Sequence, residues 1–155
     1  MTLRALFAIA LTLVSSASGA SDTLIISDAW VRATPPGKMM TAGYASLENL
    51  SNEVITITGV SAVAAGHTSL HETRIMRDRS TMRPVANLSI EAGERVSLKP
   101  GGLHIMLMKL SESLTDGQSI DICLELENND SLCSAFAVAR PVSYTHLTLP
   151  TSDLV

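Results

Sequence analysis

Short apolar or alternating segments recur along the chain from residue 24 onward, and each is closed by turn-forming residues. Segments of this length, rich in β-branched residues and interrupted about every eight to twelve positions, are typical of sandwiches and barrels. The predicted strands are 24–32, 43–50, 54–63, 68–76, 82–90, 95–98, 103–110, 119–126 and 132–139. Only Ser111 to Leu114 suggests a helical turn. Because no repeat or low-complexity linker interrupts the pattern, it predicts one all-β domain.

The two ends of the chain do not fit this pattern. Residues 1–20 combine a basic start, a short apolar run and the small residues Ser18, Gly19 and Ala20, which predicts a secretory signal peptide rather than a buried helix. Residues 141–155 resemble a sequencing adapter translated in frame, or else a polar extension of the last strand. We therefore expect an exported domain over 21–140, and we exclude His146 from the candidate ligands.

Composition excludes several classes of function. The chain has a net charge of −4 and only 3% aromatic residues, so it lacks the basic, aromatic surface that nucleic acids require. No apolar run after residue 20 reaches the roughly 18 residues of a transmembrane helix. There is no Gly-x-Ser-x-Gly motif and no phosphate-binding loop, which favours a protein that is not an enzyme.

Cys123 and Cys133 are the two cysteines, and they flank the turn-type cluster at 127–130. An exported protein permits their oxidation, and a hairpin could place them opposite each other. The register of that hairpin decides whether they form a disulfide or remain two free thiols, so both alternatives stay open.

The segment 103–110 carries an unusual stripe of side chains. Strand alternation places Leu103, Ile105 and Leu107 on one face, and His104, Met106 and Met108 on the other. The aliphatic set predicts a core-facing side. A His and Met set is usually core filling as well, because methionine packs adaptably, so packing is the simplest alternative to metal binding.

Two earlier segments supply matching groups. His71 lies in 68–76, and Met82 opens the next segment, so both can meet His104 and Met106 if the three segments are neighbours. Two imidazoles and two thioethers suit a soft, redox-active ion such as Cu(I), and imidazole also accepts Cu(II). Zinc is less suited, because it prefers thiolate, imidazole and carboxylate ligands.

At these residues the chain resembles the periplasmic copper chaperones of the PCuAC type, which serve the copper A centre of cytochrome c oxidase. The family pattern His-x10-Met-x21-His-x-Met fits His71, Met82, His104 and Met106 without a gap. The stretches AWVRATPPG, YASLEN, MRPV and AGERVSLKPGGLHIMLM also look like the family's framework. The resemblance implies a cupredoxin-like Greek-key β-barrel or sandwich that binds one Cu(I) through these four side chains in the periplasm.

The resemblance also implies acceptors, namely the copper A subunit of cytochrome c oxidase or a Sco-type copper protein. Family members often carry Met two residues after the first His, where this chain has Thr73. Met76, Met108, Met39 and Met40 are further candidates, as supporting sulfurs or, for the last two, as a mobile lip after the Pro-Pro-Gly turn.

Two neighbouring polar residues are left out of the predicted site. His67 follows Gly66, which favours a loop, and Glu72 should point away from His71.

Three other functions compete with a copper carrier. A blue-copper protein needs a thiolate beside histidine, and both cysteines stand apart from every His. A copper buffer for storage or detoxification would use the same four ligands without a dedicated acceptor. A metal-free β-sandwich for protein interaction would use none of them.

Overall fold

The computed structural model describes residues 23–77 and 79–140, so the predicted signal peptide and the adapter-like tail lie outside the described residues. The described chain forms ten strands. They are β1 Leu24–Arg32, β2 Met40–Asn49, β3 Ile55–Ser61, β4 Ala65–Met76, β5 Arg79–Val85, β6 Leu88–Ile90, β7 Arg95–Leu98, β8 Leu103–Leu110, β9 Ser119–Leu126 and β10 Ser131–Ala139.

The predicted all-β class is confirmed, with differences at several segments. The segment predicted as one strand over 82–90 is divided into β5 and β6 by Ala86 and Asn87. Ser111 to Leu114 forms bends and no helical turn, so that expectation was wrong. Strands β2, β4 and β5 each begin three residues earlier than predicted, and β4 therefore includes Gly66 and His67.

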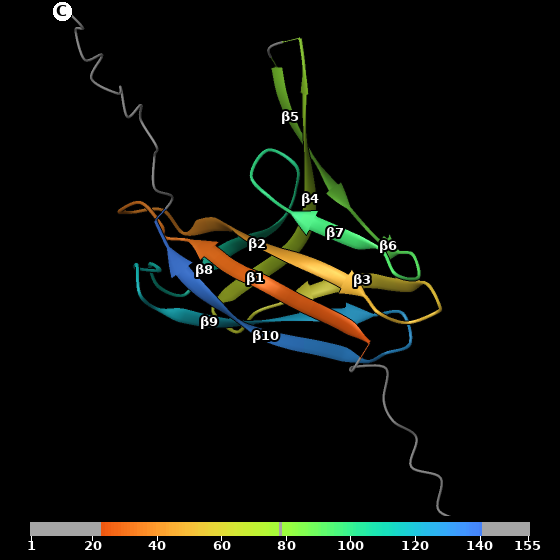
Figure 1. The fold of residues 1–155 in the computed structure, drawn as a ribbon. Coiled ribbons are helices and arrows are strands. Elements are labelled where there is room, and N and C mark those ends of the chain that lie inside the picture. Colours follow the sequence, from red (N-terminus) through yellow and green to blue (C-terminus); the bar gives the residue numbers. More distant parts are fainter. Residues whose placement is uncertain (1–22, 78, 141–155) are drawn as a thin grey trace, which may run out of the picture.

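The strands follow one path, in the order β5-β4-β8-β2-β1-β10-β9-β3-β6, and β7 also pairs with β2. Neighbours are antiparallel except β1 and β10, which run parallel. The path curls back on itself, so that β4 and β3, near its two ends, come together. The Thr68 hydroxyl of β4 donates to the Val60 carbonyl of β3. The result is a barrel-like body, with β1 and β10 side by side in front of the other strands in Figure 1.

The interior is filled by the alternating apolar positions. Fully buried side chains come from most of the long strands and include Val31, Leu47, Ile57, Ile105, Leu107, Ile122, Leu124 and Phe136. In β8 the buried Ile105 and Leu107 face this core, with Leu103 packed against it, as the alternation predicted. The other face of β8, with its His and Met residues, points away from this core, and His104 on that face is itself buried.

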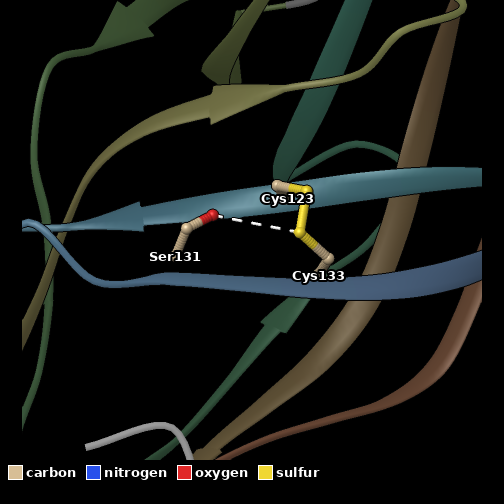
Figure 2. The surroundings of a disulfide bond; sticks show 3 residues. All are labelled: Cys123, Ser131 and Cys133. Carbon is tan, nitrogen blue, oxygen red and sulfur yellow. Dashed lines mark hydrogen bonds between the residues drawn. A yellow bond between two sulfur atoms is a disulfide. The ribbon is translucent and has the colours of Figure 1, made fainter. Parts of the chain in front are cut away.

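Cys123 of β9 and Cys133 of β10 are directly opposite in the ladder and form a disulfide. Figure 2 shows the bond between the two strands, with the Ser131 hydroxyl 3.9 Å from the sulfur of Cys133. The sequence left this pairing open, because only the register of the hairpin brings the two sulfurs together.

The hairpin of β4 and β5 extends beyond the barrel (Figure 1). Strand β4 pairs with β8 as far as Glu72 and Leu103, and beyond Glu72 its strand partner is β5. Two large apolar side chains near its tip, Ile75 and Met76, are exposed. In the part of the chain that the structure describes, no helix is both long and apolar enough to cross a membrane.

Candidate metal site

Strands β4 and β8 place His71 and His104 directly opposite each other. Opposed residues of an antiparallel pair point to the same face, so both imidazoles lie on the outer side of the barrel. Their ring centres are 6.0 Å apart, and the planes are inclined at 42°. A metal ion lies about 2 Å from an imidazole nitrogen, so two rings whose centres are about 6 Å apart can share one ion.

The ring of His104 is held in a defined tautomer. His104 is only 4% exposed, and its Nδ1 lies 2.9 Å from the carbonyl oxygen of Gly102. Because a carbonyl oxygen only accepts, Nδ1 carries the proton and donates it. The lone pair is then on Nε2, and this arrangement is the one that metal-binding histidines usually adopt.

The ring of His71 has one satisfied and one unsatisfied nitrogen. Its Nε2 lies 2.9 Å from the Ser69 hydroxyl, whereas its Nδ1 is buried without a hydrogen-bond partner among the described residues. The Ser69 hydroxyl can accept a hydrogen bond, so the tautomer with the proton on Nε2 donates it to Ser69. Nδ1 then has a free lone pair, as a metal ligand requires.

The electrostatic surroundings also keep His71 neutral. Burial, followed by the positive charge that His104 and His67 can carry, lowers the pKa of His71 below its ordinary value of 6.5. A neutral ring offers a lone pair that a protonated ring lacks, so the site is prepared for an ion at neutral pH.

Met106 lies two residues after His104 on the same face of β8. It is directly opposite Ser69 of β4 and Ala42 of β2, and it is partly buried. Met106 is therefore the next side chain on the face of the imidazoles, about 7 Å along the strand from His104.

Met82 approaches from the other side. It is opposite Thr73, which is two residues after His71, so Met82 shares the face of the imidazoles. The Thr73 amide donates to the Gly102 carbonyl at 3.0 Å and ties the base of the hairpin to the loop before β8. Met82 is 48% exposed, which makes it the most accessible of the four predicted ligands.

The other methionines divide into two groups. Met108 and Met40 are directly opposite each other on β8 and β2, on the same face as Met106. Met40 thus belongs to a strand, so the prediction that Met39 and Met40 form a mobile lip was wrong for Met40. Met39 is exposed at the end of the preceding loop, and its carbonyl accepts from the Leu110 amide.

Met76 does not join the other candidates. It pairs with Arg79 at the far end of the hairpin, and its odd offset of five residues from His71 turns it to the opposite face. The interpretation of Met76 as a supporting sulfur was therefore wrong. Glu72 also faces away from His71, as predicted, and its carboxylate lies 2.7 Å from the Arg74 guanidinium.

His67, left out of the predicted site, lies in a strand. Gly66 suggested a loop, but β4 begins at Ala65, and His67 is directly opposite Met108. Its even offset of four residues from His71 then places both side chains on one face of β4. His67 therefore shares the outer face with both imidazoles of the predicted site.

The donor chemistry of this face is soft. Within residues 23–77 and 79–140, no group of three or more His, Cys, Asp or Glu side chains could hold a metal ion. The further donors that this face offers beside the imidazoles are the thioethers of Met82 and Met106. Thioether sulfur selects Cu(I) over harder ions, so the residues fit copper better than zinc, calcium or magnesium.

Known proteins resemble the chain in sequence. The profile of a family described as "Putative lipoprotein LpqE-like" matches residues 24–138. A curated protein of Leifsonia xyli subsp. xyli, described as a "Putative lipoprotein", is 35% identical over 123 residues, which are 79% of this chain and 70% of that protein.

Solved structures resemble the chain in fold. Apo-DR1885 from Deinococcus radiodurans is 27% identical, with a TM-score of 0.62 over 92% of this chain and 97% of that chain. The copper-bound PCuAC domain from PmoF2 is 20% identical, with a TM-score of 0.64 over 77% and 94%. The predicted cupredoxin-like β fold is thereby confirmed. Because the family profile spans most of the described residues, the chain belongs to the LpqE-like lipoprotein family.

Proposed function

We propose that the protein is a copper carrier that binds one Cu(I) ion through His71, Met82, His104 and Met106 and passes it to an acceptor protein. The observation that carries the proposal is the opposition of His71 and His104 on the outer face of β4 and β8. Each ring has one nitrogen engaged with a protein oxygen, which leaves the other nitrogen for an ion.

The similar structures support a copper ligand. DR1885, which is 27% identical to this chain, has been solved in a Cu(I) form as well as an apo form. The PCuAC domain of PmoF2 has likewise been solved with copper bound. Both proteins share the fold and have been solved with copper bound, so copper is the first ion to test here.

The geometry suggests how the ion would be held and released. His104 is buried and fixed by Gly102, and His71 is fixed by Ser69, so the two imidazoles form the rigid part of the site. Met82 is half exposed on the projecting hairpin, where an acceptor can approach it. A thiolate or imidazole of the acceptor would replace Met82 first and Met106 next, because neutral thioethers are the weakest of the four ligands.

The location and the acceptor belong to the same proposal. The lipoprotein descriptions of the family and of the Leifsonia protein support an exported protein of the cell envelope. In the periplasm, the acceptor would be the copper A subunit of cytochrome c oxidase or a Sco-type protein. Cu(II) would bind more weakly, because the thioethers contribute little to a harder ion.

A transfer experiment tests this function. The Cu(I)-loaded chain is mixed under reducing, anaerobic conditions with an excess of an apo copper A domain, and copper in each protein is measured after separation. We expect most of the copper to move to the acceptor. Retention of copper by the chain would instead indicate a buffer for storage or detoxification. Failure to compete with a chromogenic Cu(I) chelator at all would indicate a metal-free interaction domain.

X-ray absorption on the reduced, copper-loaded chain provides an independent measurement of the ligands. Scattering from both sulfur and nitrogen neighbours is expected. A first shell of nitrogen and oxygen alone would contradict the proposed ligand set, because it would leave both methionines out. The variants Met82→Leu and Met106→Leu should each reduce the sulfur contribution.

A further inference from the structure

The outer face of the barrel carries a second row of soft donors. Met40 of β2, Met108 of β8 and His67 of β4 occupy consecutive strands at one level, because Met40 is opposite Met108, and Met108 is opposite His67. All three point outward, since opposed residues share a face and the intervening Leu107 is buried in the core. None of the three belongs to the four-residue site described above.

The spacing of this row suits one ion. Directly opposed side chains on neighbouring strands have their Cβ atoms about 4.5–5.5 Å apart. Met108 is the central member, with a thioether on one side and an imidazole on the other. Long methionine side chains can close the remaining distance to a shared ion, because they have three rotatable bonds.

Exposure argues against simple packing of these residues. Met40 is 52% exposed, His67 is exposed, and Met108 is only partly buried. Methionines that fill a core are buried, and an exposed Met40 beside a partly buried Met108 gains little from packing. The arrangement does provide two sulfurs and one nitrogen that water and small ions can reach.

We propose that Met40, Met108 and His67 form a second site for a soft monovalent cation, such as Cu(I) or Ag(I), on the outer face of β2, β8 and β4. This site would lie beside the first one. Met108 is two residues from Met106 on the same face of β8, which corresponds to about 7 Å along a strand. The level of the ladder between this row and the two imidazoles holds Met106, Ser69 and Ala42.

The position suggests a role for the second site in loading. An ion held by Met40, Met108 and His67 could pass to Met106 and then to the imidazoles by exchange of one ligand at a time. This role rests on the proposed function, whereas the existence of the second site does not. The two questions can therefore be separated in one experiment.

The experiment follows the methionine methyl groups of the full chain by nuclear magnetic resonance during titration with Ag(I), a redox-inert probe for Cu(I). The chain has seven methionines, and single Met→Leu variants assign their signals. We expect the first equivalent to shift Met82 and Met106, and the second equivalent to shift Met40 and Met108. Met76, on the other face of the hairpin, provides the internal control.

The double variant His67→Ala/Met108→Leu tests the second site directly. We expect the affinity for the second equivalent to fall at least about tenfold, with the Met40 signal no longer shifted by it, while the first equivalent still shifts Met82 and Met106. The proposal is overturned if Met40 and Met108 remain unshifted in the parent chain, or if Met40 responds equally in the variant. An equal shift of Met76 would indicate unspecific thioether binding and would also overturn it.

The pattern of shifts distinguishes this proposal from the proposed function. If Met40 and Met108 shift while Met82 and Met106 do not, the second site stands and the four-ligand site fails. If only Met82 and Met106 shift through two equivalents, the four-ligand site stands and the second site fails. The circular dichroism spectrum of each variant confirms that the β structure is retained.

Discussion

His71 and His104 face each other across β4 and β8, 71 opposite 104 in the ladder, with their ring centres 6.0 Å apart. Each ring is oriented by a protein oxygen, His71 by the Ser69 hydroxyl and His104 by the Gly102 carbonyl. The two imidazoles are therefore positioned before any ion arrives, and little side-chain ordering is needed on binding.

Met106→Leu should separate metal binding from packing. The substitution keeps the volume of the side chain but removes the sulfur, so the folded state should lose less than about 1.5 kcal/mol. The Cu(I) affinity should fall at least about tenfold, equivalent to about 1.4 kcal/mol. Competition with a chromogenic chelator measures the affinity, and Met76→Leu is the matched control because Met76 faces away from the site. Equal affinities for the parent and Met106→Leu would contradict this role of the sulfur.

Ser69→Ala should weaken the site without removing any proposed ligand. The Ser69 hydroxyl orients His71 through Nε2 at 2.9 Å, and loss of such an orienting partner typically reduces metal affinity about 10–100-fold. Ser80→Ala, on the exposed part of the hairpin, should leave the affinity unchanged. The same chelator competition applies, and an unchanged affinity for Ser69→Ala would show that the hydroxyl does not position the ring.

The lowered pKa of His71 predicts a pH dependence of stability. Burial and the nearby His104 and His67 lower the pKa in the folded state, so the unfolded chain takes up the proton first as the pH falls. The contribution of His71 to the free energy of unfolding is therefore greatest above the ordinary pKa of about 6.5. It declines as the pH falls from there through the folded-state pKa.

Urea unfolding of the metal-free chain between pH 8 and pH 5 measures this effect. The variant His71→Gln cannot titrate in this range, so its stability should depend less on pH below about 6.5 than that of the parent. A titration of the imidazole signals should also place the pKa of His71 below its ordinary value. The variant His67→Ala should raise that pKa, because it removes one of the nearby imidazoles. Parallel stability curves for the parent and His71→Gln would contradict the prediction.

The disulfide should contribute to stability but not to metal binding. Cys123 and Cys133 close a loop with a sequence separation of 10, for which the chain-entropy estimate is about 3 kcal/mol. The double variant Cys123→Ser/Cys133→Ser should therefore unfold at lower denaturant concentration. Its Cu(I) affinity should match that of the parent, because β9 and β10 do not carry any of the proposed ligands. A large loss of affinity in the folded variant would show that the sulfurs take part in binding.

The local pattern of the chain was sufficient for much of the fold. Alternation predicted most of the strands and the inward face of Ile105 and Leu107, because side-chain direction in a strand depends only on parity along the chain. Turn chemistry predicted most boundaries, for example at Gly37 and Gly117, whose positive φ values of 74° and 89° suit glycine. It failed at Gly66, which lies inside β4, and between Val85 and Leu88, where one predicted strand became two.

By itself, the sequence determined which side chains are available and which of them share a face within one strand. Only the tertiary structure decided that β4 lies between β5 and β8, and that His71 is opposite His104 while Met76 is remote. It also added His67 to the outer face and joined Cys123 to Cys133. The physical reason is that pairing and register depend on contacts between distant segments, and a shift of one residue would turn every side chain of a strand to the other face.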